Sequence, residues 1–432
     1  MRRFAIVLAL AVPAVAGAQQ IVPSARMAAT ADVLGAAARG ADALSVNPAL
    51  LGVGDLSRWS VVTGAPTLSW HASPVSLADL SKYGGKTVPD AVKARWLAQI
   101  PANGAQHAAA DLGATGVAVA WRGFAASLQA VAGATAALPH DAVATLLYGN
   151  TNPDGTPATR SFTNGNASAF DAVLVSVGGG RRVGSAHLLG SNVALYAGAS
   201  LKSVLRGSYA AAWNVQGTST AQPVTATADF PYMYSNGAPS GVGVDVGVAA
   251  VASTWTLSAA ISDLVNGFHV TPSSMLASDG RASVSAGSVV ATAPEVLVSS
   301  GALPAAVDAA ARQKISDAVF ARTLRMAGAW RSRPDLLLAA DVRVGAGGGL
   351  QRLAAVSAGV GAEYDWKSWL PVRAGIRNTR DGMSSAVGAG LRRGAWELDA
   401  STGVESGVAG TAPVFGVSLS WGGPALGGSA GQ

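Results

Sequence analysis

Residues 353–421 alternate apolar and polar side chains with period two in five successive runs. In the last run Phe415, Val417, Leu419 and Trp421 share one parity, and glycine and serine occupy the other. Successive side chains of a β-strand point to opposite faces of the sheet, so each run has one apolar and one polar face. Short turn-rich breaks separate the runs, which predicts a β-meander.

A sheet of this kind is either a soluble sandwich with an apolar core or a membrane barrel with an apolar outer surface. Only 12% of the residues are charged, against about 25% in an average soluble domain, and 53 are glycine. This composition favours the barrel. Tryptophans near the ends of the runs fit an interfacial aromatic girdle: Trp59, Trp70, Trp121, Trp255, Trp330, Trp396 and Trp421. A soluble secreted β-sandwich stays open, and membrane fractionation would distinguish it.

The N-terminus has the three parts of a bacterial secretory signal peptide. Arg2 and Arg3 precede an apolar stretch at residues 4–15, and residues 16–18 read Ala-Gly-Ala. We expect cleavage after Ala18. Beyond it, no uninterrupted apolar run reaches the roughly 18 residues of a membrane-spanning helix. The chain has no cysteine, so neither a disulfide nor lipidation at the cleavage site is expected.

The polar parity of the runs carries charges of both signs, and in a barrel this parity faces the lumen. The predicted lumen-facing residues are Asp245, Asp341, Arg343, Glu363, Arg373, Arg377, Glu397 and Asp399. Charges enclosed in a medium of low dielectric constant are expected to pair. Two interpretations remain open: a salt-bridged, plugged lumen, or a polar pathway that selects a solute.

Signals for enzyme chemistry are missing from the sequence. The five histidines are far apart and lack zinc-ligand spacing, and there is no G-x-S-x-G motif. Basic residues are scattered rather than gathered in an arm or stripe, which argues against nucleic acid. We therefore predict no catalytic residues, no metal, no cofactor and no nucleic-acid partner.

One segment near the N-terminus carries a family resemblance. The stretch GADALSVNPALLG, residues 40–52, resembles the start of FadL-type and PorV-type outer-membrane barrels. In those families an Asn-Pro-Ala turn follows an N-terminal segment that lies in or under the barrel, and Asn47, Pro48 and Ala49 match that turn. The stretches IPANGAQ (100–106) and LPHDAVATLLYGNT (138–151) are similar to an uncharacterised branch of the same barrels.

The runs and the resemblance together predict an all-β, antiparallel transmembrane β-barrel of about 14 strands with a few short helices. The expected organisation is a signal peptide (1–18), a hatch-like internal segment (19–56), the barrel (57–422) and a flexible tail (423–432). Helices are expected within residues 27–39, 86–100 and 302–319, a loop within residues 150–166, and part of a strand followed by a long loop within residues 210–238.

The resemblance implies an outer-membrane location and the passage or binding of hydrophobic small molecules, as FadL-type proteins do with long-chain fatty acids. The alternative is a non-transporting barrel that serves as scaffold or adaptor for a secretion or envelope complex, as PorV-type barrels do. Residues 210–238 and 302–319 would then be docking surfaces. Expected partners are outer-membrane lipid, hydrophobic small molecules and the barrel-assembly machinery.

Overall fold

The computed structural model describes residues 23–54, 59–64, 66–75, 77–102, 104–222, 224–285, 288–345, 350, 356–378, 382–407 and 410–422. The predicted signal peptide, including its cleavage site after Ala18, and the predicted tail at residues 423–432 lie outside the described residues.

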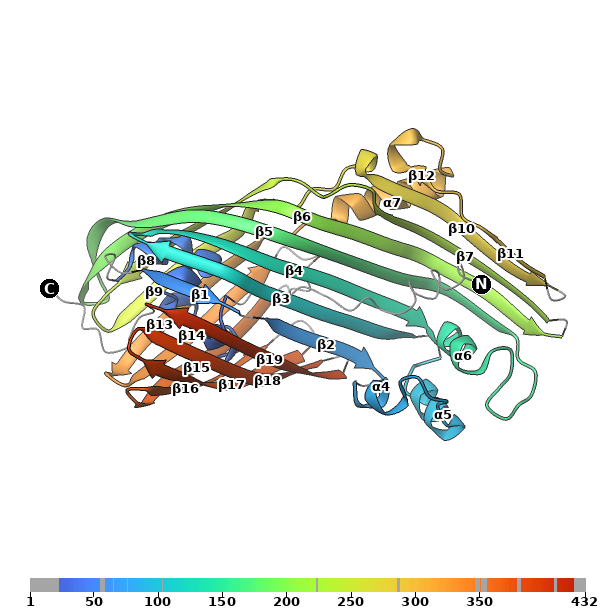
Figure 1. The fold of residues 1–432 in the computed structure, drawn as a ribbon, viewed down its shortest axis with the longest axis horizontal. Coiled ribbons are helices and arrows are strands. Elements are labelled where there is room, and N and C mark those ends of the chain that lie inside the picture. The colour runs from blue at the N-terminus through green and yellow to red at the C-terminus, as the bar shows by residue number, and fades with distance from the viewer. Residues whose placement is uncertain are drawn as a thin grey trace.

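One closed antiparallel sheet forms a β-barrel (Figure 1). Fourteen strand positions complete the circuit, because β1 and β2 follow each other along one position between β3 and β19. The circuit consists of β1 Ser60–Thr63 with β2 Thr67–Ser73, β3 Ala105–Trp121, β4 Phe124–Pro139, β5 Arg160–Leu188, β6 Ser191–Ala221, β8 Val242–Val251, β9 Trp255–Val265, β13 Thr323–Arg333, β14 Leu336–Gly345, β15 Val356–Lys367, β16 Leu370–Asn378, β17 Gly382–Arg393, β18 Trp396–Gly407 and β19 Gly410–Trp421. The predicted all-β barrel of about 14 strands is confirmed.

The sheet extends beyond the circuit on one side. Strands β5 and β6 have 29 and 31 residues, and β6 pairs with β8 through residues 194–203 but with β7 through residues 210–221. The extension consists of the outer parts of β5 and β6 with β7 Val224–Ser235, β10 Met275–Ser285, β11 Ser288–Thr292 and β12 Val296–Leu297. Figure 1 shows these strands running well past the shorter strands.

The two ends of the barrel differ. The terminal end contains the start of β1, the end of β19 and tight hairpins such as the one between β3 and β4. The opposite loop end contains helices α4 Leu77–Tyr83, α5 Asp90–Ala98 and α6 His140–Tyr148 (Figure 1). Helix α7 Ala305–Asp317 lies between β12 and β13, after the 3-10 turn η4 Val298–Ser300; a further turn, η3 Pro272–Ser274, precedes β10.

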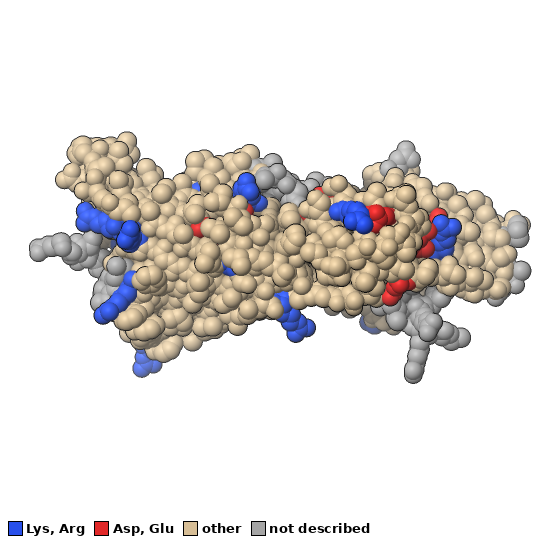
Figure 2. All heavy atoms as spheres, turned by 90° about the horizontal axis from the view of Figure 1, so that it is seen from above, with Lys and Arg blue, Asp and Glu red and all other residues tan. Residues whose placement is uncertain are grey.

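The outer face of the barrel wall is apolar. Val248, Val360 and Val417 are 56%, 54% and 52% exposed, whereas Asp245 and Ser418, on the other parity, are buried. Figure 2 shows few and scattered charged side chains on the face that it displays. A continuous exposed apolar wall around a closed barrel is suited to contact with the hydrocarbon of a bilayer.

Tryptophans gather at the terminal end of the barrel. They are Trp59, Trp121, Trp255, Trp330, Trp366, Trp369, Trp396 and Trp421, and Trp59 stacks on Trp121 with ring centroids 4.9 Å apart. Trp70 lies in β2, near the middle of its strand position.

Within the described part of the chain, no helix has the length and apolar character needed to cross a membrane.

Three sequence predictions need correction. The helix expected within residues 27–39 is only α2 Ala25–Ala28 and the 3-10 turn η1 Gly35–Ala37, because Ala31 and Asp32 adopt φ of 50° and 59° and turn the chain. The loop at 150–166 ends early, since β5 begins at Arg160.

The loop expected at 210–238 is mostly the strands β6 and β7. Pro231 in β7 suggested a break, but it lies where a bulge between Ala212 and Gln216 interrupts the pairing with β6. The missing N–H of the proline therefore disrupts no regular pairing with that strand.

Candidate functional site

Residues 23–54 fill the terminal half of the lumen and are called the hatch here. The hatch contains α2, η1, α3 Ala41–Val46 and η2 Pro48–Gly52, and nearly all of its residues are buried. Met27, Leu34, Leu44 and Leu50 are at most 1% exposed. Figure 1 shows these blue elements enclosed by the strands at the left of the molecule.

The turn at Asp32 connects the hatch to three arginines of the wall. The backbone carbonyl of Asp32 accepts hydrogen bonds from Arg325, Arg343 and Arg377 at 2.5, 2.6 and 2.7 Å. The same arginines surround the carboxylate of Asp341, with Arg325 at 2.6 Å and Arg377 at 2.7 Å. The unusual backbone of Asp32 therefore directs one carbonyl oxygen at a buried cationic cluster.

A second buried network connects the start of the hatch to β15, β16 and β18. Glu363, fully buried, accepts from Arg26 of the hatch at 2.8 Å and from Arg373 at 2.6 Å. Arg373 also donates to Glu397 and Asp399, both at 2.5 Å. Arg392 extends the network to Glu397 at 2.9 Å and to Asp365 at 2.7 Å. Removing one member would leave uncompensated buried charge.

The second half of the hatch lies against strands β5, β6 and β8 through close backbone contact. A β-carbon on Gly198 would lie 2.5 Å from the carbonyl oxygen of Pro48, and one on Gly247 would overlap the side chain of Asn47. Asn47 donates to the carbonyls of Val248 and Ala259, both at 3.1 Å, and accepts from the backbone N–H of Ala49 at 3.0 Å. Glycines in the wall thus make room for the Asn47-Pro48-Ala49 turn.

Asp245, the remaining predicted lumen residue, belongs to a separate cluster. Lys202 of β6 lies 2.8 Å from Asp245 and 2.8 Å from Asp263, and Asp245 also accepts from Ser200 at 3.0 Å. All eight predicted lumen residues are thus buried among ionic partners. Seven of them gather around the first half of the hatch, and Asp245 does not join them.

The loop end of the lumen is apolar. The rings of Phe170, Phe268 and Phe320 meet at centroid distances of 5.2 to 6.2 Å. Around them pack strand side chains such as Met233 and Met275, and the apolar face of α7 with Ala311 and Ile315. This set is called the apolar cluster. Asn266, just after β9, donates to the backbone carbonyl of Phe320, which precedes β13, at 2.6 Å.

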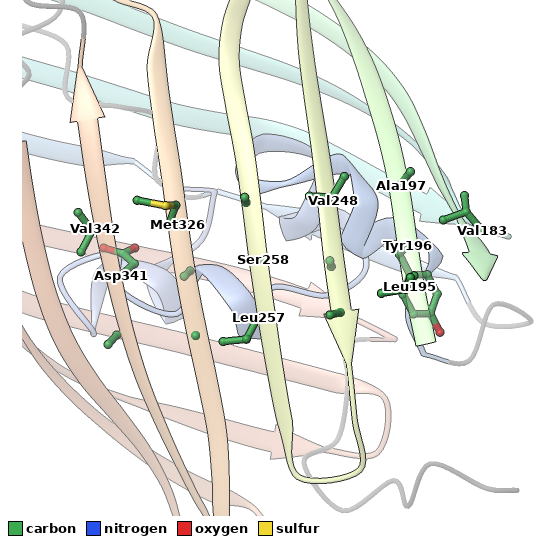
Figure 3. A pocket seen from close by; sticks show the side chains of 16 residues that line it. Val183, Leu195, Tyr196, Ala197, Val248, Leu257, Ser258, Met326, Asp341 and Val342 are labelled. Atoms are coloured by element: carbon green, nitrogen blue, oxygen red, sulfur yellow. The ribbon is translucent and has the colours of Figure 1, made fainter. Parts of the chain in front are cut away.

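A groove of about 690 Å³ lies on the outer wall and not in the lumen. Its apolar lining includes Val248, Leu257, Met326 and Val342, which are exposed on the outer face (Figure 3). Asp341 also borders the groove, but its carboxylate pairs with Arg325 inside the barrel. The groove therefore faces the surroundings of the barrel.

The chain matches solved structures but not sequences. No family model matches, and no curated protein matches by sequence. The fold is similar to that of the Ralstonia pickettii toluene transporter TbuX, with a TM-score of 0.52, 12% identity, and coverage of 92% of this chain and 97% of that one.

Two further structures have the same fold. A Pseudomonas aeruginosa FadL homologue matches with a TM-score of 0.50, 12% identity, and coverage of 94% and 99%. The monoaromatic hydrocarbon channel CymD matches with a TM-score of 0.50, 10% identity, and coverage of 94% and 98%. The chain therefore has the FadL-type barrel fold, and the predicted resemblance is confirmed at this level.

Several site residues escaped the sequence reasoning. Arg26, Asp32 and Lys202 complete the ionic clusters, and the phenylalanines form the apolar cluster. Lys202 follows strand parity with Ser200 and could have been found that way. Arg26 and Asp32 lie in irregular backbone, where no period indicates direction. Among the described residues, no group of three or more His, Asp or Glu side chains is arranged to hold a metal ion.

Proposed function

We propose that this chain is an outer-membrane barrel that binds or passes hydrophobic small molecules of fatty-acid-like character. The observation that carries the proposal is the apolar cluster at the loop end of the lumen, directly inside a barrel with an apolar outer wall. Burial of hydrocarbon in such a cluster is favourable by about 25 cal/mol per Å² of apolar surface.

The fold supports the same proposal. Neighbours of this fold include proteins named as a toluene transporter, a monoaromatic hydrocarbon channel and a FadL homologue. Fold alone does not define function, so the argument depends on the lumen of this chain. In the proposed orientation the terminal end faces the periplasm, after export directed by a signal peptide cleaved after Ala18 and insertion by the barrel-assembly machinery.

Reconstitution into liposomes tests the proposal. The purified barrel is incorporated into liposomes, and uptake of a labelled long-chain fatty acid and of labelled toluene is compared with uptake by protein-free liposomes. We expect faster uptake of at least one compound. Uptake of both compounds at the same rate as in protein-free liposomes would overturn the proposal.

The ionic attachment of the hatch favours one second candidate, a non-transporting scaffold or adaptor. The hatch, attached through Arg26 to Glu363 and through Asp32 to Arg343, fills the terminal half of the lumen. Helix α7 offers one docking surface on its exposed face, opposite Ala311 and Ile315. A pull-down from native outer membranes tests this candidate. Recovery of a stoichiometric envelope protein would support it, and recovery of only the assembly machinery would argue against it.

A further inference from the structure

Three aromatic side chains form a row on the outer face of β7. Phe230, Tyr232 and Tyr234 are two residues apart, so they share one face of the strand. Ring centroids lie 6.3 Å apart for the first pair and 6.4 Å for the second, with interplanar angles of 9° and 11°. All three are half-buried. The opposite parity, which contains Met233, faces the apolar cluster.

The neighbouring strand β10 has small residues opposite the first two rings. The register places Gly280 of β10 beside Phe230 and Ser278 beside Tyr232. Ring carbons of Phe230 occupy the space that a β-carbon of Gly280 would need. Tyr232 and Tyr234 are nearly parallel to Phe230, and Leu276 of β10 lies beside Tyr234, so the three rings form one aromatic row beside β10, called the shelf here.

A carboxylate borders the shelf. Glu295, exposed in the segment before β12, accepts from the hydroxyls of Tyr232 and Tyr234 at 2.8 and 2.7 Å. An ionised carboxylate has about four lone-pair positions, so two hydrogen bonds leave it able to accept more. The shelf therefore combines three aromatic rings with a carboxylate that accepts hydrogen bonds.

The shelf lies beyond the lipid-facing part of the wall. On the outer faces of β5 and β6 the large exposed apolar side chains end at Val177 and Leu205. Tyr232 pairs with Ala212, seven positions further along β6 (212 − 205). At about 3.3 Å per residue, this is roughly 23 Å along the strand. The row therefore lies beyond the exposed apolar side chains of β5 and β6, where a ligand in water can reach it.

We propose that this aromatic shelf binds saccharide rings on the outside of the barrel. A pyranose ring has apolar C–H faces that stack on aromatic faces, and hydroxyls at its rim that donate to a carboxylate. Phe230, Tyr232 and Tyr234 provide the stacking surface, and Glu295 provides the acceptor. The saccharide is either the oligosaccharide of a surface glycolipid or a free polysaccharide, because both present the same chemistry.

Calorimetric titration of the full-length barrel tests the proposal, in a detergent without a sugar headgroup. Two probes separate the sources: core oligosaccharide released by mild acid from lipopolysaccharide, and the soluble hexasaccharide cellohexaose. The test variant is Y232A/Y234A. Phe124→Ala is the matched control, because Phe124 is an aromatic residue that is 71% exposed at the terminal end of β4. Heat-modifiable gel migration confirms that each variant folds.

We expect at least one probe to bind, and Y232A/Y234A to weaken that binding about tenfold or more, since each aromatic contact contributes about 0.5–1.5 kcal/mol. Phe124→Ala should change the affinity less than twofold. Glu295→Gln should weaken binding a few-fold while the rings remain in place. Absence of binding by either probe at millimolar concentration, or equal affinity for Y232A/Y234A and the wild type, would overturn the proposal.

Discussion

The two ends of the lumen are packed by different kinds of contact. At the terminal end, Arg26 of the hatch pairs with Glu363 of the wall, and Asp32 of the hatch pairs with Arg343, in ionic hydrogen bonds. At the loop end, the apolar cluster packs hydrocarbon side chains around Phe268 and Phe320. Buried ion pairs contribute little net stability, but separating one leaves an unpaired buried charge at a large cost in free energy. Apolar contacts do not depend on direction, so their side chains can exchange neighbours at a smaller cost. We infer that the hatch has one fixed position and that the cluster can rearrange around a ligand.

Loss of Arg373 should produce the largest effect. Arg373→Leu would leave Glu363, Glu397 and Asp399 without their shared cation, and we expect a loss of about 3–5 kcal/mol in the free energy of unfolding. The measurement is denaturant unfolding followed by heat-modifiable gel migration. Arg393→Leu, at an exposed position on the next strand, is the control and should be near neutral. Equal effects of the two variants would contradict an ionic attachment.

Asp42 of the hatch predicts a pH dependence. Burial raises the pKa of its carboxyl to about 6, although Ser24 donates to it at 3.0 Å. The folded state therefore holds this proton more tightly than the unfolded chain. The resulting stability is fully present below pH of about 4 and is lost as the pH rises through 6, a change of about 2–3 kcal/mol.

Asp42→Asn lacks this titration, so the stability difference between it and the wild type should change by that amount between pH 4 and pH 7.5. Denaturant unfolding at both pH values measures it. A difference that is independent of pH would contradict the predicted burial of an ionisable group in the hatch.

Close packing of the second half of the hatch predicts a smaller effect. Gly198→Val would place side-chain atoms in the space occupied by Pro48, at a cost of about 1–3 kcal/mol in stability. Gly184→Val is a matched control on β5, because nothing lies within 4 Å of a β-carbon there. Thermal unfolding of both variants measures the loss of stability. A Gly198 variant as stable as the Gly184 variant would show that the hatch does not contact the wall here.

The smallest expected effect concerns the apolar cluster. Phe320→Leu should reduce the free energy of unfolding by only about 1 kcal/mol, because the surrounding apolar side chains can fill the space. Phe415→Leu, on the lipid-facing wall, is the control for a general effect of the substitution. Denaturant unfolding compares the two variants. A loss above 3 kcal/mol for Phe320→Leu alone would indicate a rigid cluster and would remove the contrast between the two ends.

Sequence alone predicted the strands whose two faces meet chemically different surroundings. In β15 to β19 one face belongs to the exposed apolar outer wall and the other to the lumen, so period two is uninterrupted. In β5 and β6, bulges such as those at Val173 and Arg182 shift the parity, and the outer face becomes polar beyond Leu205. The alternation disappears there, so the sequence predicted a loop over residues that belong to the end of β6 and to β7.

The candidate site was predictable from periodicity where it lies on strands, and from resemblance at one turn of the hatch. Parity placed Asp341, Glu363 and Arg373 on the lumen face, and the Asn47-Pro48-Ala49 turn was found through its resemblance. The partners of these charges in the hatch lie in short irregular turns, where direction depends on tertiary contact. The apolar cluster combines side chains from β4, β5, β6, β7, β10, α7 and the connecting loops, and no local pattern indicates that these meet.

Uptake by reconstituted liposomes tests most directly the claim that the lumen carries hydrophobic molecules. The account predicts faster uptake of labelled long-chain fatty acid or toluene with the wild-type barrel than with protein-free liposomes, and a changed rate with Phe320→Leu but not with Phe415→Leu. Uptake equal to that of protein-free liposomes for both compounds would contradict it.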